Sequence, residues 1–267
     1  MSTLVGAAIG MLAGLHAATW GMYKDAPHEG FSVLKYLRSP LLGTFLGAIV
    51  QQLGALNPTR PADALILFGV VYVVERALGE IYKTFLRNED QSKYFIPMQL
   101  HMFGEVVRSR TARLAAGTLY AGTLLGMVAC LYQYDSGAGA KPHLLVLLLI
   151  GSLGGWISAF GGAWKDAPLE GFQILKFFRS PALAAMFAYA AFGLTDSLLL
   201  VTLAATGYTI ATTETYKTFL FPSKPRGKFA GKPVNFPDML LTRQRAVLPY
   251  VAVWAALVLV ALKAFHG

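Results

Sequence analysis

Long apolar runs dominate the chain, and none of them shows the strict alternation that is typical of a β-strand. A helix needs ~20 apolar residues to cross ~30 Å of hydrocarbon, and most of the runs approach that length. Only helices and closed barrels satisfy their backbone polar groups in lipid. The pattern therefore predicts an all-α, polytopic helical membrane protein. The runs are Leu4–Met22, Ala64–Val74, Leu114–Leu131, Leu144–Phe160, Leu198–Ala211 and Ala246–Phe265.

Two stretches of the sequence occur twice in the same order. Residues 9–40 align with residues 150–181 with 18 identities in 32 positions. The segment EIYKTFL at 80–86 recurs as ETYKTFL at 214–220. Two blocks in the same order indicate an internal duplication. The predicted organisation is a first membrane repeat (1–133), a linker (134–142) and a second membrane repeat (143–267).

Each half is expected to contribute four helices, so about eight transmembrane helices are predicted in two four-helix repeats. The helices after Pro40 and Pro181 are expected to be short, and either tilted or re-entrant. An even number of spans per half makes the repeats parallel, related by an axis along the membrane normal. The predicted helices cover residues 3–23, 41–56, 62–86, 111–133, 143–164, 182–196, 197–220 and 245–265.

Composition supports a membrane location and charge suggests an orientation. The chain is 55% hydrophobic and 14% charged, whereas soluble domains have about 25% charged residues. The net charge of +9 comes from basic loops on one predicted side, including the segment 221–237, which we expect to form an extended strap near lipid headgroups. The positive-inside rule places these loops in the cytoplasm and both termini on the opposite side. Topology and anionic headgroups account for the charge, so no nucleic-acid partner is predicted. The oligomeric state is left open.

The duplicated block contains a charged motif. KDAPHEGFSVLKYLRSP occupies 24–40 and KDAPLEGFQILKFFRSP occupies 165–181. Asp25 followed by Pro27 is typical of a helix start, which predicts a short amphipathic helix at the interface ending near Arg38. Capping, dipole complement and snorkelling can each explain one charge. Yet apolar positions drift between the copies, and His28 becomes Leu169, while all five charges recur. These are Lys24, Asp25, Glu29, Lys35 and Arg38, matched by Lys165, Asp166, Glu170, Lys176 and Arg179.

Two chemistries suit these ten charges. Lysine and bidentate arginine bind phosphate oxygens, and the carboxylate pairs Asp25/Glu29 and Asp166/Glu170 suit a hydrated Mg²⁺. Alternatively, the two motifs form a charged ring at the mouth of a pathway. In the second block, Glu80/Lys83 and Glu214/Lys217 form a secondary candidate set, for which an interfacial ion pair is the simpler interpretation.

The sequence carries three hypotheses about function. The first is a transporter or channel for a small anionic or phosphate-bearing solute. The second is a membrane-embedded enzyme or carrier that acts on a lipid or polyprenyl phosphate with a divalent cation. The third is a noncatalytic subunit of a membrane complex. No P-loop, GxSxG, HExxH or CxxC motif is present, so the sequence does not indicate an enzyme.

Overall fold

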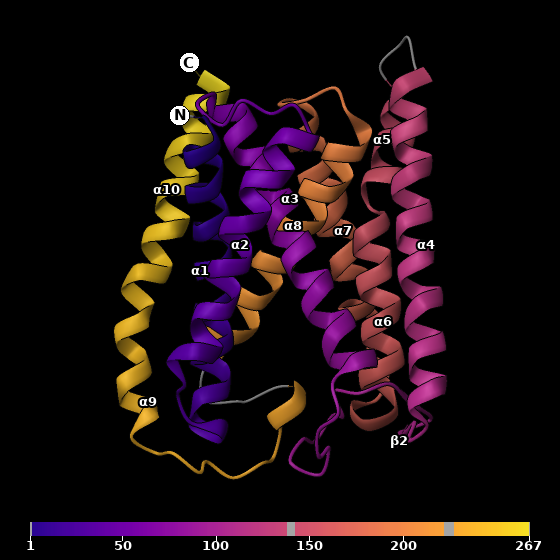
Figure 1. The fold of residues 1–267 in the computed structure, drawn as a ribbon, viewed down its shortest axis with the longest axis vertical. Helices are drawn as coiled ribbons and strands as arrows, with labels where there is room; N and C mark the ends of the chain where they lie inside the picture. The colour runs from indigo at the N-terminus through magenta and orange to yellow at the C-terminus, as the bar shows by residue number, and fades with distance from the viewer. Residues whose placement is uncertain (1, 138–141, 222–226, 267) are drawn as a thin grey trace.

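The computed structural model describes residues 2–137, 142–221 and 227–266. These residues form a bundle of long helices, as the sequence predicts (Figure 1). Its first half contains α1 (Ser2–Glu29), α2 (Val33–Leu53), α3 (Pro61–Ile81), the π-helical turn η1 (Tyr82–Leu86) and α4 (Arg110–Gly137). The second contains α5 (Leu144–Gly151), α6 (Leu153–Glu170), α7 (Ile174–Phe192), α8 (Leu198–Phe219), η2 (Gly227–Phe229), α9 (Met239–Thr242), η3 (Arg243–Ala246) and α10 (Val247–His266). A two-residue antiparallel ladder joins β1 (His101–Met102) to β2 (Glu105–Val106).

Within the described ranges, five helical stretches are long and apolar enough to cross a membrane. They are α1, α2, α4, the α5–α6 stretch and the stretch from α9 to α10. α4 and α10 lie at opposite edges of the bundle (Figure 1) and expose apolar side chains such as Leu125 and Leu259. Exposed apolar side chains around a bundle are expected where lipid is the solvent. The chain therefore has the character of a helical membrane protein.

The centre of the bundle is a close crossing of α3 and α8. A Cβ atom at Gly207 would lie 2.0 Å from the backbone oxygen of Gly69, and one at Gly69 would lie 2.8 Å from Cα of Ala204. Small residues allow such close backbone approach between helices in a membrane. Ile66, Leu67 and Val71 of α3 are fully buried beside this crossing. The crossing joins a helix of each half, so the two halves share one core.

α1 and α2 pack through a stripe of glycines. Gly10 would meet the backbone oxygen of Gly43 at 2.0 Å if it carried a Cβ, and Gly14 would meet that of Ser39 at 2.1 Å. The GxxxGxxxG face on the first helix is thus the surface that receives the second.

The duplicated motif does not form the short interfacial helix that the sequence suggests. α1 continues through Asp25 and Pro27 to Glu29. The chain then turns at Gly30, whose φ of +76° favours glycine. α2 starts at Val33 and runs straight through Pro40, so the helix expected to start after Pro40 is neither short nor separate. The second copy breaks the same way, at Gly171 (φ +79°), and α7 runs through Pro181 from Ile174.

A distant arginine explains how α1 accommodates Pro27. A proline inside a helix cannot donate to the carbonyl four residues earlier, which leaves that oxygen without its partner. Here that oxygen belongs to Tyr23, and the guanidinium of Arg243 donates a 2.8 Å hydrogen bond to it. The compensation comes from 220 residues along the chain. Local sequence signals therefore point to a helix start where the structure has a helix end.

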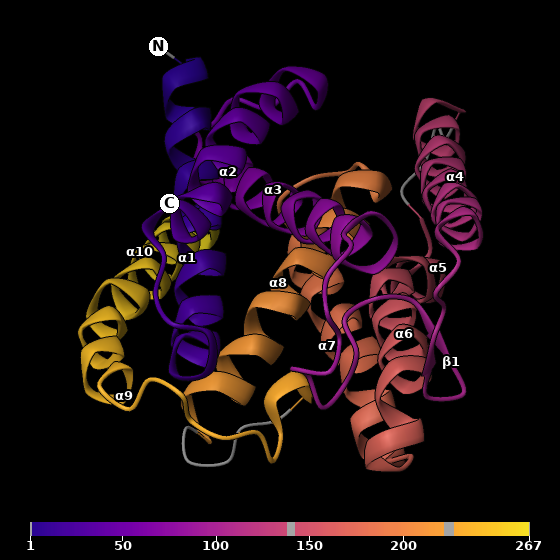
Figure 2. The same ribbon diagram turned by 60° about the horizontal axis from the view of Figure 1, so that its bottom comes forward.

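The two ends of the bundle differ in character. Both helix breaks, the loop 87–109 and the segment 227–238 gather at one end, whereas both termini lie at the other (Figures 1 and 2). At the terminal end, α4 extends into the predicted linker as far as Gly137, and Asp135 accepts hydrogen bonds from Ser197 Oγ (2.6 Å) and Leu198 N (2.9 Å) at the start of α8. The rest of that linker, 138–141, lies outside the described residues.

Candidate functional site

A cavity of about 1900 Å³ opens among the helices at the charged end of the bundle. All fourteen site residues expected from the sequence line it, including both copies of the charged motif. They are Lys24, Asp25, Glu29, Lys35, Arg38, Lys165, Asp166, Glu170, Lys176, Arg179, Glu80, Lys83, Glu214 and Lys217. The structure therefore brings the two halves of the predicted site to one place.

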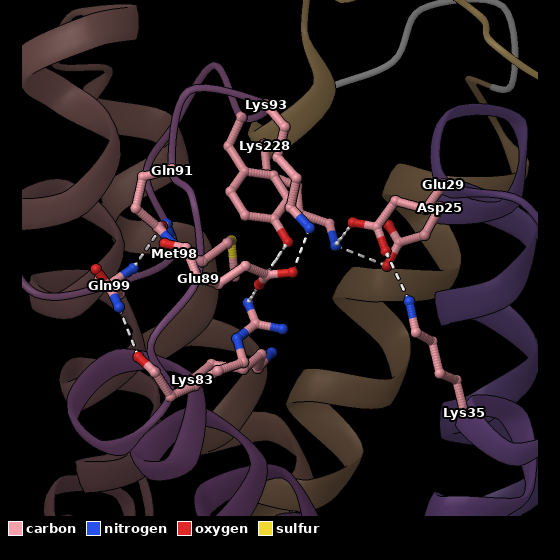
Figure 3. Close-up of polar contacts among 12 residues, drawn as sticks. Asp25, Glu29, Lys35, Lys83, Glu89, Gln91, Lys93, Met98, Gln99 and Lys228 are labelled. Carbon is pink, nitrogen blue, oxygen red and sulfur yellow. Dashed lines mark hydrogen bonds and ion pairs between the residues drawn. The ribbon is translucent and has the colours of Figure 1, made fainter.

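In the first copy, a lysine from outside the motif neutralises the carboxylates. Lys228 lies 2.8 Å from Asp25 and 3.5 Å from Glu29 (Figure 3). The motif's own Lys35 makes a longer contact: its ammonium lies 4.0 Å from the Glu29 carboxylate, and its side chain is 72% exposed. Lys228 belongs to the segment 227–238, which we call the strap.

In the second copy, the motif's own lysine takes this role. Lys176 donates to Glu170 at 2.9 Å and to Asp166 at 3.2 Å. The strap touches this copy with its backbone, because Gly227 N donates to Glu170 at 3.4 Å. Equivalent carboxylates thus have different lysine partners in the two copies.

The strap is fixed to the first copy by contacts that need His28. Phe229 stacks on the imidazole of His28 with ring centroids 4.5 Å apart, and His28 Nδ1 donates to the Pro233 carbonyl at 2.9 Å. Backbone bonds add to this, since Phe236 N donates to the Pro27 carbonyl at 2.9 Å. The second copy has Leu169 at this position. The exchange of His28 for Leu169 therefore distinguishes the copy that the strap covers.

The loop 87–109, which we call the hairpin loop, covers the second copy instead. His101 Nε2 lies 3.1 Å from the backbone oxygen of Lys165, and Trp164 Nε1 donates to the His101 carbonyl at 3.1 Å. The hairpin loop belongs to the first half and covers the second motif, while the strap belongs to the second half and covers the first. The two also meet, because Phe95 N donates to the Lys228 carbonyl at 2.7 Å.

The secondary residues form the expected ion pairs and connect the halves. Lys83 lies 2.5 Å from Glu80, and Lys217 lies 3.1 Å from Glu214. Across the cavity, Lys165 interacts electrostatically with Glu80. Reciprocally, Glu214 interacts with Lys24. Each carboxylate of the second block is therefore within electrostatic range of a motif lysine from the other half, without a salt bridge to it.

The cavity is rich in cations, and four of those described form no salt bridge with a carboxylate. Eleven Lys or Arg side chains and seven Asp or Glu side chains line it. In the part of the chain that the structure describes, no salt bridge joins a carboxylate to Lys24, Arg38, Lys165 or Arg179. The guanidinium of Arg179 lies over Tyr216, 5.7 Å from the ring centroid, and its buried Nε makes no hydrogen bond. Unpaired cations in a partly buried site favour an anionic ligand.

The two carboxylate pairs are less suited to bind a metal ion than the sequence suggests, because lysines already contact them. Asp25 and Glu29 face Lys228, and Asp166 and Glu170 face Lys176. The described residues contain no group of three or more His, Cys, Asp or Glu side chains placed to hold a metal ion. The donor set thus fits two lysine-bridged carboxylate pairs better than a Mg²⁺ site.

Two loop residues have pKa values shifted by this charge network. Burial lowers the pKa of the Lys228 ammonium, but the carboxylates of Asp25 and Glu29 raise it more, so its pKa lies above the ordinary value. Burial raises the pKa of Glu89 in the hairpin loop, but the hydrogen bond from Lys93 and the charge of Arg87 lower it further. Both residues are therefore held in their charged forms at neutral pH.

Several cavity residues are missing from the expected set. Arg76 donates to Glu80 at 2.9 Å, and Arg87 lies 2.7 Å from Glu89. Lys228 lies in the segment expected to touch lipid headgroups, but its ammonium contacts protein carboxylates. These three residues lie outside the motif and have no charged counterpart in the other half, so the duplication gives no signal for them. Comparison of the chain with protein-family models, curated proteins and solved structures finds no match in any of the three.

Proposed function

We propose that the chain is an integral membrane carrier for an anionic or phosphate-bearing solute, which binds among the cations of the two motif copies. One observation carries the proposal: the charges that the duplicated motif preserves in both halves line a single cavity. Lysine and arginine without carboxylate partners suit phosphate oxygens, and arginine offers two parallel donors.

The extent of the cavity supports a carrier more than an open channel. Its described lining reaches from Glu29 and Lys228 to Leu131 and Leu153, and includes no residue from 54–60 or 193–197 at the opposite end. A cavity that enters from one end fits a state of an alternating-access carrier, with the solute bound between repeats that are parallel in the membrane. In this proposal all eight long helical stretches span, the basic end is cytoplasmic and both termini are outside.

A paired arginine variant tests this proposal. Arg38→Ala/Arg179→Ala removes one unpaired cation from each copy, and uptake of inorganic phosphate and of small phosphate monoesters into proteoliposomes is measured. We expect uptake to fall by about tenfold or more, equivalent to ~1.4 kcal/mol of lost binding. Arg108→Ala/Arg110→Ala is the matched control, because Arg108 lies in the loop 87–109, Arg110 begins α4 directly after it, and neither lines the cavity. Equal uptake by both double variants and the unmodified protein would rule the proposal out.

A second candidate function, a carrier or enzyme for a lipid phosphate, is supported by the apolar part of the cavity wall. Beyond the charged end the lining is apolar, with Leu124, Ile157 and Leu203 facing the same space. Such a wall suits a carrier or enzyme that handles a lipid or polyprenyl phosphate. A scaffold role has no feature of the cavity in its favour.

A further inference from the structure

The cavity has two chemically different parts, and α4 forms one side of the apolar part. Tyr120, Leu124, Val128 and Leu131 of α4 line it, opposite residues of α6 and α8. Residues 120–131 rise by roughly 16 Å at 1.5 Å per residue. That is about half of the ~30 Å hydrocarbon thickness of a bilayer. The apolar part is therefore long enough to hold much of a lipid chain.

α4 is attached to the bundle near its two ends and stands apart between them. Near the charged end, Gly117 packs against Phe85, and Arg113 donates to Asn88 at 3.2 Å. At the far end, Asp135 caps α8. Between these points the helix lies at the edge of the bundle (Figure 2), and Leu125, which lines the cavity, is 69% exposed. The middle of α4 thus borders the cavity without sealing it against the surrounding lipid.

We infer that the ligand is a membrane lipid with a phosphate-bearing head group. Its head lies among Lys24, Lys165 and Arg179, and its hydrocarbon chain lies along the inner face of α4. This inference rests on the proposed function and names its substrate class. The arrangement matches a lipid standing in one leaflet, with the head at the charged end of the bundle and the chain toward the membrane centre.

Volume and polarity favour this amphiphile over a small hydrophilic anion. The cavity of about 1900 Å³ exceeds the ~300–1,000 Å³ of ordinary small-molecule sites. A small anion would occupy only the charged end and leave water against leucine and isoleucine side chains, which is unfavourable. A lipid satisfies the cations and covers the apolar wall at the same time.

Two glycine substitutions separate chain binding from head-group binding. Gly162 of α6 lines the cavity, and a Cβ there meets no atom within 4 Å, so Gly162→Phe fills the space without a clash at the Cβ. Gly126 of α4 has equally free space but lies outside the lining, so Gly126→Phe is the matched control. Arg179→Ala removes a head-group contact.

Native mass spectrometry of the detergent-solubilised protein titrated with phosphatidic acid measures the binding. We expect Gly162→Phe and Arg179→Ala each to weaken it by about tenfold or more, and Gly126→Phe to change it less than about twofold. Thermal unfolding of each variant shows that the fold is retained. Unchanged binding in Gly162→Phe, with weaker binding in Arg179→Ala, would overturn the inference, because only the head group would then be recognised.

The same set of proteins distinguishes this inference from the proposed function. If none of the variants changes phosphatidic acid binding, but uptake of inorganic phosphate depends on Arg38 and Arg179, the ligand is a small solute and only the inference fails. If neither lipid binding nor uptake depends on those arginines, both fail.

Discussion

The two copies of the charged motif have nearly the same sequence and the same backbone turn, but their carboxylates are neutralised in different ways. Asp166 and Glu170 bind Lys176 of their own copy. Asp25 and Glu29 bind Lys228 of the strap, and Lys35 stays largely in solvent. The difference follows from the segments that cover them, since His28 offers a stacking and hydrogen-bonding surface to the strap and Leu169 does not. Identical charges therefore need not have identical partners, and the partner depends on tertiary packing.

The largest predicted effect concerns the close packing of two helices through a glycine, which both copies share. Gly14→Ala and Gly155→Ala each place a methyl group against the backbone of the next helix, 2.1 Å from the Ser39 oxygen and 2.5 Å from the Ser180 oxygen. We expect each to lower the free energy of unfolding by about 2–3 kcal/mol, because backbone has to move.

Thermal unfolding in detergent measures this loss. Gly21→Ala and Gly162→Ala are the matched controls, since a Cβ at either position meets nothing within 4 Å. They are expected to be neutral or to stabilise by up to ~1 kcal/mol, as alanine is the better helix former. A loss confined to one copy would mean that the two helix pairs are not packed alike.

The next two substitutions each remove the lysine that neutralises the carboxylates of one copy. Lys228→Met removes the lysine that contacts Asp25 and leaves Glu29 with Lys35. Lys176→Met removes the lysine that contacts Asp166 and Glu170. Each change is expected to cost about 1–2 kcal/mol, less than for a fully buried pair because all these groups are partly exposed. Only Lys228→Met should increase hydrogen exchange in the strap.

A double-mutant cycle sharpens this test. Lys35→Met should be nearly neutral in the unmodified protein, because Lys35 is exposed and its contact is long. In the Lys228→Met background it should cost clearly more, because Lys35 is then the remaining lysine of the first copy. Additive effects of the two changes would show that the lysines do not compete for these carboxylates.

A smaller effect is expected from making the first copy resemble the second. His28→Leu removes the stacking on Phe229 and the hydrogen bond to the Pro233 carbonyl, and should cost about 1 kcal/mol. Hydrogen exchange of residues 227–238 should rise by a matching factor. Leu169→His is the reciprocal control and should have no effect on the strap. Equal protection of the strap in His28→Leu would mean that backbone bonds alone hold it.

The smallest effect at ordinary pH is the titration of Lys228. Its folded-state pKa lies above the usual lysine value because of Asp25 and Glu29, despite opposing burial. The stabilisation is therefore complete below pH ~10.4 and is lost as pH rises through the raised pKa. A spin label at the exposed strap position Val234, in a Cys130→Ser background, should keep its mobility from neutral pH to about pH 10 and become more mobile above it. Lys228→Arg should keep the label immobile at higher pH, because arginine does not deprotonate there.

Much of the architecture is predictable from sequence because lipid imposes simple rules. Long apolar runs and one-sided basic segments predict the helical membrane class. The duplicated charges of the motif mark side chains that lie around one cavity. These charges can be recognised without tertiary information, since they occur twice in the sequence.

The remaining features depend on contacts between distant segments. From sequence alone, Pro27 indicates a helix start. In the structure it lies inside α1, because Arg243 donates to the Tyr23 carbonyl the hydrogen bond that the proline cannot donate. Lys228 is not part of the duplicated motif, and its contacts with Asp25 and Glu29 form only when the strap folds back on α1. The apolar part of the cavity depends on α4 standing apart, which hydropathy does not encode.

The position of Lys228 along the chain has a consequence for biosynthesis. Ribosomes add ~5–20 residues per second, so the roughly 200 residues between Glu29 and Lys228 take about 10–40 s to make. During that interval the first motif is complete but lacks the lysine that neutralises it in the finished fold. Lys35, six residues from Glu29, is available throughout. Of the two lysines that pair with Glu29 in the folded protein, Lys35 is therefore the one already made when the first motif is synthesised.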